Sequence, residues 1–380
     1  MRFTVLGAGL QGSACAFDLL QDASVTEVRL ADRAFTQLPA FLQPYVGTRL
    51  TLHPVDARDA DAVGAVMEGS VAALCALPYY FNLPLAEAAV ARGVHFADLG
   101  GNTAIVESQI RTLDAPARAK GVSVLPDCGL APGLVNVIAE HGIRQCDTVS
   151  AVRCYVGGLP QAPTPPLNYQ IVYSLEGVLD YYTTPSWVLR DGRPTQVAAL
   201  SETVPVTFPE PLGTLEAFHT AGGLSLMAQR YAGRIDTMEY KTLRYPGHAA
   251  LMAAIRDLGF LGLEPVTVDG QQVVPRALAV AILDPLLRKP GAPDLVALRV
   301  EVEGHKDGRA VSHAWELVDR ADTERGLTAM MRTTGFSLAI IGRLQAAGLA
   351  TPGVHTPDVG VPPDAYLSAL GARGIELRAR

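Results

Sequence analysis

Short apolar runs and segments of helical periodicity alternate along residues 1–130. The runs at 2–6, 26–31, 49–53, 71–76, 94–97 and 122–125 are expected strands, and 58–68, 82–92 and 103–120 are expected helices. Continuous apolar runs bounded by turn residues are typical of strands that are buried on both faces. Because strands alternate with helices, the pattern predicts an α/β fold whose doubly wound parallel sheet carries helices on both faces.

A glycine motif joins the first expected strand to a helix. GAGLQG begins at Gly7 and is followed by SACAFDLL, which has helical periodicity. Gly7 permits a tight turn, Gly9 lets a pyrophosphate approach the backbone, and Gly12 lets the helix pack closely on the strand. The next apolar run ends at Asp32, 20 residues beyond Gly12, where a carboxylate can accept hydrogen bonds from the ribose hydroxyls. The glycine spacing alone is weak evidence, but its context predicts a Rossmann dinucleotide-binding domain.

Asp32 also bears on the choice of cofactor. A carboxylate there repels the 2′-phosphate of NADP, so the sequence predicts NAD, although the adjacent Arg33 could pair with that phosphate. Ligands of such sheets lie at the carboxyl ends of the strands. Further cofactor contacts are therefore expected in the glycine motif and after the later strands, at Leu10, Gln11, Arg33, Asp56, Leu77, Pro78 and Cys128.

The pattern changes after residue 130. Helices are expected at 131–143, 223–231, 247–258 and 334–348, and strands at 148–160, 186–190, 196–199, 203–208, 295–303 and 310–318. The last two strands alternate like an antiparallel ribbon with EGHKDGR as its turn. These elements predict a second, mixed α+β domain. We expect a Rossmann domain at 1–128, a substrate-binding and dimerisation domain at 129–333, and a helical segment at 334–380 that returns to the first domain.

Composition argues against several classes of protein. The chain has 380 residues and a net charge of −7, and it contains no dense basic run, so a nucleic-acid partner is not expected. The longest charge-free stretch, 69–86, contains two prolines and is no membrane span, and the first residues lack a secretory signal. The five cysteines form no CxxC pair and the eight histidines are scattered. We expect a cytoplasmic protein with no metal.

Several longer segments resemble a known family. They are VLGAGLQG, ALPYYFNLPLAEAAVARGVHFADLGGN, LPDCGLAPGLVN, YVGGLPQAPTPPLNY, LEAFHTAGG, KTLRYPGH and MRTTGFSLAIIGRL. CGLAPG and TLRYPG are the most specific of these. On them the chain resembles the saccharopine dehydrogenase and reductase family, and within it the lysine 6-dehydrogenase branch. The resemblance implies a homodimer that uses NAD to deaminate L-lysine oxidatively at Cε, giving a semialdehyde that cyclises to piperideine-6-carboxylate.

The implied chemistry assigns roles to particular residues. The substrate carboxylate needs a fixed cation, and Arg244 in TLRYPGH is the candidate, because the matching arginine of reductase relatives holds a carboxylate. A structural ion pair is the alternative for Arg244. His248, four residues later, could share a helix face with Arg244 and act in catalysis, or could be a buried structural histidine.

The reacting amine must lose a proton before it can release a hydride. Asp98 follows a strand and could take that proton or hold the cation, or it could cap a turn. Asp127 follows the next strand and could face the same crevice. Asn102 and Glu216 are candidates for hydrogen bonds to the substrate, Glu216 to its α-ammonium group. Tyrosines could enclose the aliphatic part of lysine, namely Tyr169, Tyr173, Tyr181 and Tyr182.

Two other functions stay open. A saccharopine- or carboxynorspermidine-type reductase joins an amine to a carbonyl and reduces the imine, and it would need more carboxylate anchors than Arg244. A non-catalytic cofactor-binding module would have an apolar cleft, and the polar residues that follow two strands argue against it.

Overall fold

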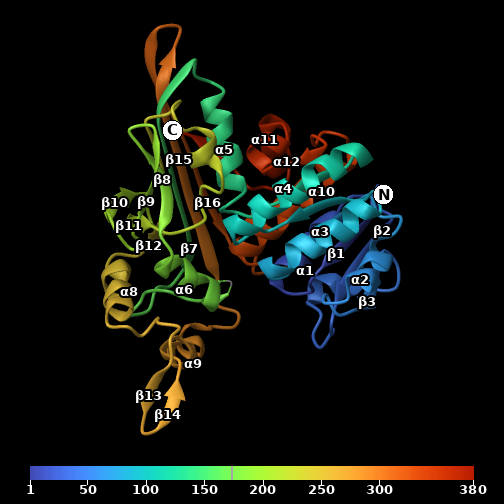
Figure 1. Cartoon of the computed structure of the whole chain (residues 1–380), viewed down its shortest axis with the longest axis horizontal. Helices are drawn as coiled ribbons and strands as arrows, with labels where there is room; N and C mark the ends of the chain where they lie inside the picture. The colour runs from blue at the N-terminus through green and yellow to red at the C-terminus, as the bar shows by residue number, and fades with distance from the viewer. Residues whose placement is uncertain (173) are drawn as a thin grey trace.

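Seven parallel strands form the first sheet of the computed structural model, which describes residues 1–172 and 174–380 (Figure 1). Their order is β17 (Gly353–Val354), β6 (Ser123–Leu125), β5 (His95–Asp98), β4 (Ala72–Cys75), β1 (Arg2–Leu6), β2 (Glu27–Asp32) and β3 (Leu50–Pro54). The direction of strand succession reverses between β1 and β4, which is where such sheets bind ligands. The predicted doubly wound α/β fold is confirmed.

Helices cover both faces of this sheet. The first face carries α1 (Leu10–Leu20) and α10 (Phe336–Ala346), and the other carries α2 (Ala60–Met67), α3 (Asn82–Ala91) and α4 (Thr103–Lys120). Phe3 and Val5 pack under α1 and α10, whereas Leu6 belongs to the core beneath α2 and α3. The strands therefore bury both faces, which explains their continuous apolar sequences. The tail contributes α10 and β17, so residues far apart in the sequence complete one layer.

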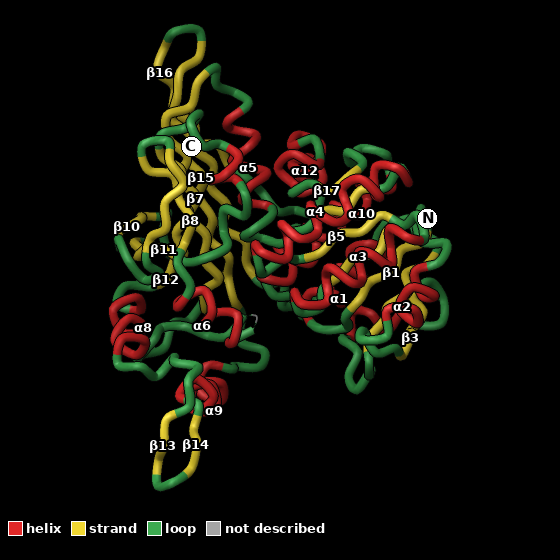
Figure 2. The backbone as a smooth tube through the Cα atoms, in the orientation of Figure 1, coloured by secondary structure: helices red, strands yellow, loops and turns green. Residues whose placement is uncertain are grey.

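The second sheet is mixed and lies beside the first (Figure 2). Its main path runs β10 (Val204–Thr207), β11 (Thr214–His219), β12 (Thr237–Arg244), β7 (Thr148–Pro160), β15 (Asp294–Lys306), β16 (Arg309–Arg320) and β18 (Arg378–Ala379). Two further strands, β8 (Ser186–Arg190) and β9 (Arg193–Val197), join through β12. β12 and β7 are parallel, and the other pairs are antiparallel.

The long β15–β16 hairpin corrects one expected turn. The strands pair continuously as far as Lys306 and Arg309, so EGHKDGR is mostly strand. Only Asp307 and Gly308 turn, with φ of 51° and 73°. Two consecutive residues of positive φ are what a tight hairpin with right-handed strand twist requires, and Asp-Gly is a favoured pair there.

Other elements surround the second sheet, and several were not expected from the sequence. They are α5 (Leu134–Ile143), α6 (Leu175–Thr183), α7 (Met227–Arg230), α8 (His248–Asp257), α9 (Pro275–Leu287), α11 (Pro357–Gly360) and α12 (Pro363–Gly371). A separate hairpin consists of β13 (Val266–Val268) and β14 (Gln271–Val273). The sequence analysis missed β11, β12, β13, β14, β17, β18, α6 and α9. Within residues 1–172 and 174–380, every helix is too short or too polar to cross a bilayer.

Candidate active site

The turn between β1 and α1 has the shape that a pyrophosphate needs. Gly7 has a φ of +98°, which side chains rarely permit, and a Cβ at Gly12 would lie 1.8 Å from the carbonyl oxygen of Gly7. A Cβ at Gly9 would meet no protein atom within 4 Å, so the space beside Gly9 is open. Because Gly9 caps the amino terminus of α1, that space adjoins unpaired backbone N–H groups.

A cavity of about 570 Å³ lies at the carboxyl ends of β1, β2 and β3. Its lining includes four predicted cofactor residues, Asp32, Arg33, Asp56 and Leu77. A carboxylate oxygen of Asp32 accepts a hydrogen bond of 2.7 Å from the backbone N–H of Ala8, which fixes Asp32 beside the glycine turn. This cavity and the adjoining turn therefore fit the adenosine and pyrophosphate parts of a nicotinamide dinucleotide.

Arg58 is a lining residue that the sequence analysis missed. Its guanidinium lies 2.5 Å from a carboxylate oxygen of Asp56 and lowers the pKa of Asp56. Arg33 and Arg58 thus place two cations in the cavity that also contains the Asp32 carboxylate.

A second cavity, the cleft cavity, lies between the two sheets and has a volume of about 210 Å³. Gln11, from the first turn of α1, lines one side, and Tyr240, Thr242 and Arg244 of β12 line another. The Oε1 atom of Gln11 is buried and has no hydrogen-bond partner among the described residues. The cleft cavity therefore joins the nucleotide-binding turn to a buried cation.

Tyr182 and Tyr169 orient Arg244. The Nε–H of Arg244 donates to the hydroxyl of Tyr182 at 3.2 Å, and its guanidinium lies 4.8 Å from the ring centroid of Tyr169. Arg244 is only 3% exposed. A guanidinium presented in this way suits planar recognition of a carboxylate.

His248 extends this network behind Tyr182. Its Nδ1 lies 2.9 Å from the carbonyl oxygen of Leu167, and its Nε2 lies 2.9 Å from the hydroxyl of Tyr182. Because a carbonyl can only accept, Nδ1 carries the proton and Nε2 accepts from Tyr182. Burial lowers the pKa of His248 to about 3, so the ring is neutral. The hydroxyl of Tyr182 can then accept from the Nε–H of Arg244 while it donates to Nε2 of His248. Arg244 therefore donates to Tyr182, and Tyr182 donates to His248.

The expected helix shared by Arg244 and His248 is not present. Arg244 is the last residue of β12, and His248 is the first residue of α8. The two side chains meet through Tyr182 instead. His248 is not among the residues that line the cleft cavity, so the structure places it as a residue that positions Arg244.

Asp98 does not reach the crevice as expected. It is fully buried, and its two carboxylate oxygens accept from the backbone N–H of Gly100 at 2.7 Å and from Nε2 of Gln109 at 2.8 Å. Burial raises the pKa of Asp98 to about 6. The carboxylate therefore fixes the loop after β5 against α4, which is the turn role rather than a contact with a ligand.

Asp127 lies behind a residue that the sequence analysis missed. The hydroxyl of Ser225 donates to its carboxylate, and Ser225 lines a third cavity of about 390 Å³, the outer cavity. Burial raises the pKa of Asp127 to about 7, and Asp98 adds to the rise. A Cβ at Gly100 would lie 1.7 Å from Oδ1 of Asp127, so the loop must carry glycine there. Among the described residues, Asp127 itself lines neither the cleft cavity nor the outer cavity, and Ser225 connects it to the outer cavity.

Two expected substrate residues are helix caps. The side chain of Asn102 accepts from the backbone N–H of Ala104 and of Ile105, although Asn102 also lines the outer cavity. Glu216 accepts from the N–H groups of Gly247 and Ala249 at 2.9 and 2.6 Å, which caps α8. Carboxylates at a helix amino terminus satisfy otherwise unpaired donors. The expected contact of Glu216 with the substrate stays a prediction.

The remaining candidate cofactor and substrate residues differ in whether they line a cavity. The Sγ–H of Cys128 donates to the carbonyl oxygen of Leu125 at 3.0 Å, and its side chain is fully buried in the core. Leu10 is 54% exposed beside the turn, and Pro78 precedes the short helix Tyr79–Phe81. Tyr181 lines both the cleft cavity and the outer cavity. Tyr173 lies outside the described residues.

Period-two spacing along β12 would have identified two of the missed residues. Tyr240, Thr242 and Arg244 lie on one face of the strand because successive side chains alternate. The sequence analysis had Arg244 but no strand, so it could not infer Tyr240 and Thr242.

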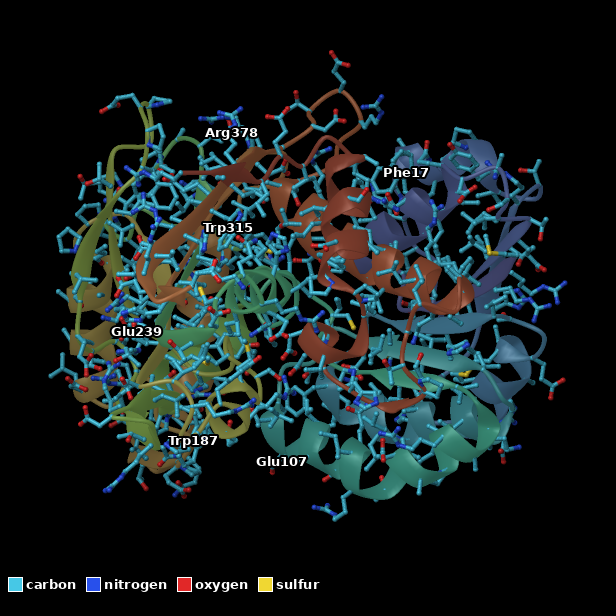
Figure 3. All side chains as sticks on the ribbon, turned by 90° about the horizontal axis from the view of Figure 1, so that it is seen from above. Phe17, Glu107, Trp187, Glu239, Trp315 and Arg378 are labelled. Carbon is cyan, nitrogen blue, oxygen red and sulfur yellow. The ribbon has the colours of Figure 1, made fainter. Side chains whose placement is uncertain are left out.

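A separate cluster of titratable groups lies in the second sheet. One ligand atom each from Glu202, His219 and Glu239 lies within 4.8 Å of the others, a grouping that the sequence did not suggest. Arg190 lies 2.7 Å from Glu202 and 2.9 Å from Glu239, and Lys241 lies 4.0 Å from Glu239. These cations balance the carboxylates, as expected of a structural ion-pair network. Figure 3 shows Glu239 on the side of the molecule opposite Phe17, which lies on α1.

Family models match nearly the whole chain. Residues 3–125 match the saccharopine dehydrogenase NADP binding domain, and residues 129–375 match the saccharopine dehydrogenase C-terminal domain. The chain belongs to the saccharopine dehydrogenase family. The finer resemblance to lysine 6-dehydrogenases is not decided by these matches.

Individual relatives agree with this family. The chain is 26% identical over 230 residues to saccharopine dehydrogenase (NADP⁺, L-glutamate-forming) of Pyricularia oryzae, covering 55% of this chain and 48% of that one. It is 27% identical over 274 residues to carboxynorspermidine synthase of Vibrio cholerae, covering 67% and 62%. The chain thus spans about half the length of this Pyricularia relative. The fold is similar to that of apo saccharopine dehydrogenase (L-Glu forming) from Saccharomyces cerevisiae, with a TM-score of 0.80, 20% identity, and coverage of 100% and 99%.

Two glycine variants test the nucleotide turn. Gly12→Ala should lower the free energy of unfolding by about 1–3 kcal/mol, because its Cβ would overlap the backbone of Gly7. Gly9→Ala should leave unfolding unchanged but weaken dinucleotide binding at least about tenfold, because its methyl group fills the open space. Urea unfolding and fluorescence titration measure the two effects. Unaltered nucleotide affinity in Gly9→Ala would contradict the assignment.

Asp98→Asn tests whether Asp98 is structural. The variant can still accept from Gly100, and it can donate to Oε1 of Gln109, which is buried and has no partner among the described residues. The folded-state pKa, about 6, exceeds the ordinary 3.8, so ionisation of the parent costs stability as the pH rises from about 4 through 6. Because Asn cannot ionise, the variant should gain roughly 2–3 kcal/mol over the parent between pH 4 and pH 8.

Unfolding in urea at the two pH values measures this gain. If the free energies of unfolding of variant and parent differ by the same amount at pH 4 and at pH 8, the buried charge of Asp98 does not control stability. Turnover supplies a second readout: kcat should stay within about threefold of the parent, whereas loss of a catalytic base costs on the order of 10²-fold.

Proposed function

We propose that the chain is an NAD-dependent dehydrogenase that oxidises L-lysine at Cε to the 6-semialdehyde, which cyclises to piperideine-6-carboxylate. The observation that carries this proposal is Arg244, the one charged side chain among the described residues that line the cleft cavity. A single anchoring cation suits a substrate with a single carboxylate. Gln11 of the nucleotide turn lines the same small cavity, so a substrate held by Arg244 lies next to the cofactor.

A bound nicotinamide dinucleotide supplies the hydride acceptor, and Gly7, Gly9, Gly12 and Asp32 would hold it. The protein has to orient the substrate and remove an ammonium proton. Arg244, fixed by Tyr182, binds the carboxylate. The hydroxyls of Tyr240 and Thr242 in the cleft cavity offer hydrogen bonds to the amine and to the water that attacks the iminium.

Few groups in this site could accept the proton of the substrate ammonium group. The described residues that line the cleft cavity include no carboxylate, histidine or lysine. The proton leaves to water, which can carry it to the outer cavity, where Ser225 donates to Asp127, whose pKa of about 7 suits an acceptor near neutral pH. Asp98 and His248, expected from the sequence to act directly, contribute instead by fixing the loop after β5 and the orientation of Arg244.

A carboxynorspermidine-type reductase is the second candidate function. The outer cavity meets the cleft cavity at Tyr181 and could receive a second substrate or a longer one. Its described lining contains Asp180 and Trp187 but no lysine or arginine. That chemistry accommodates an amine better than the two carboxylates of a glutamate moiety, so it favours a carboxylated polyamine over saccharopine. A spectrophotometric screen of NAD reduction with lysine, ornithine, saccharopine and carboxynorspermidine separates the candidates.

Variants of the Arg244 network separate binding from chemistry. Arg244→Lys keeps the charge but loses the planar fork, so KM for lysine should rise by about tenfold or more while kcat changes little. Tyr182→Phe removes one hydrogen bond to Arg244 and should raise KM about fivefold. Tyr231→Phe is the control, because its hydroxyl bonds to Glu140 outside the site. A fall in kcat at constant KM in Arg244→Lys would contradict the anchoring role.

The cofactor preference has its own test. The carboxylate of Asp32 should make NAD bind at least about tenfold more tightly than NADP. Asp32→Asn should narrow that ratio, whereas Arg33→Ala should weaken NADP alone, because Arg33 lines the cavity beside Asp32. Fluorescence titration with both dinucleotides gives the ratio. If the parent protein binds NAD and NADP with equal affinity, the predicted NAD preference is wrong. Binding of NADP would agree with the match of residues 3–125 to an NADP binding domain.

A further inference from the structure

Gln11 carries a polar atom whose partner the described chain does not supply. Its side-chain oxygen, Oε1, is buried and has no hydrogen-bond partner among the described residues. Leaving a buried acceptor unpaired costs stability, so an atom of this kind in a native protein points to a bound molecule or to a role in catalysis. Gln11 lines the cleft cavity, so the partner of Oε1 is to be sought in this cavity.

The surroundings of Gln11 distinguish it from the threonines of the same cavity. The hydroxyls of Thr220 and Thr242 lie 2.7 Å apart and share a hydrogen bond, and the hydroxyl of Thr334 donates to Sδ of Met330 at 3.3 Å. The other residues that the segment 1–133 contributes to the described lining are apolar or glycine, namely Leu99, Gly129, Leu130, Ala131 and Pro132. Because water competes less beside an apolar wall, a hydrogen bond from a ligand to Oε1 is stronger there than in solution.

The position of Gln11 sets which end of a substrate it meets. Gln11 is the second residue of α1 and directly follows the turn that fits the pyrophosphate. Arg244, the proposed anchor of the carboxylate, lies on another side of the same cavity. A substrate held by Arg244 therefore turns its far end toward Gln11 and the cofactor. Because an amide oxygen only accepts hydrogen bonds, that end must offer an N–H or an O–H.

We propose that Oε1 of Gln11 accepts a hydrogen bond from the nitrogen of the reacting amine, the one whose carbon loses the hydride. The assignment rests on the proposed function, since it takes the substrate to be an amine that Arg244 anchors. When the hydride leaves the carbon with its electron pair for the dinucleotide, the nitrogen lone pair forms the C=N bond and the N–H groups gain positive charge. The hydrogen bond to Oε1 therefore strengthens in the transition state, while the backbone at the start of α1 remains for the pyrophosphate.

Binding of lysine and of norleucine tests this contact without turnover. Norleucine keeps the carboxylate, the α-amino group and the length of the carbon chain but has no ε-nitrogen. With NADH bound, no hydride can be accepted, so calorimetry gives the Kd of each compound. Gln11→Met keeps the length of the side chain but removes the oxygen, so it should reduce the preference for lysine over norleucine about fivefold or more. Gln11→Glu keeps an acceptor and should retain at least the preference of the parent protein.

Gln229→Met is the matched control. Oε1 of Gln229 is also buried without a partner among the described residues, but Gln229 does not line the cleft cavity, so its variant should keep the preference of the parent. Fluorescence titration should give Gln11→Met the NADH affinity of the parent. An unchanged preference for lysine in Gln11→Met would overturn the proposal, and a loss of NADH affinity with it would assign Oε1 to the cofactor instead. Gln11→Leu repeats the measurement if Gln11→Met does not fold.

Turnover and the affinities of the parent separate this proposal from the proposed function. Gln11→Met should lower kcat about tenfold or more besides raising KM, whereas Arg244→Lys raises KM alone. If the parent binds no lysine, the proposed function is wrong, and the two affinities are then measured with the amine that reduces NAD in the screen and with its deamino analogue. A reduced preference of Gln11→Met for that amine supports the contact, and an unchanged preference overturns it.

Discussion

The close contact of the tail helix α10 with the first sheet is the constraint on which the rest of the structure depends. A Cβ at Gly335 would lie 2.7 Å from the carbonyl oxygen of Gln11 and from Cβ of Ala14, and one at Gly342 would lie 2.7 Å from Leu74. Only glycine therefore lets this segment lie directly on α1 and β4. The hydroxyl of Ser337 donates to the carbonyl oxygen of Cys128, which ties α10 to the chain where it leaves the first sheet.

The position of α10 has consequences for the cleft cavity. The loop after β6 begins at Pro126 and is held by α10 on one side, through Ser337, and by Ser225 on the other, through Asp127. This loop and the turn that carries Gln11 form the cofactor side of the cleft cavity, while β12 forms the other. Because each wall is fixed by buried hydrogen bonds, the distance between the nucleotide turn and Arg244 is set by the fold. A rigid separation of this kind favours the orientation of two reactants.

The first sheet was predictable because its strands bury both faces and so appear as continuous apolar runs. β12 was not, because TMEYKTLR places Glu239, Lys241 and Arg244 in buried positions. Arg190, which lies on β8, balances Glu239, and a partner that distant in sequence leaves no local signal. The same reason explains Asp98, whose partner Gln109 lies on the next helix. The glycine turn and Asp32 were predictable because the glycine spacing, and the distance from it to an acid at the end of the next strand, are themselves visible in the sequence.

The three cavities together limit the substrate more narrowly than any residue alone. A dinucleotide held at the glycine turn would lie beside Gln11 at one end of the cleft cavity, and Arg244 lines the same cavity of about 210 Å³, so the space between them suits a short chain. Tyr181 lines both the cleft cavity and the outer cavity, so it lies where a longer molecule would pass from one to the other. Since α6 carries both Tyr181 and Tyr182, movement of this helix would change the length of the pocket and the orientation of Arg244 together. Arg276 of α9 donates to Asp180 and to Thr183 of α6, so the position of α6 depends on α9.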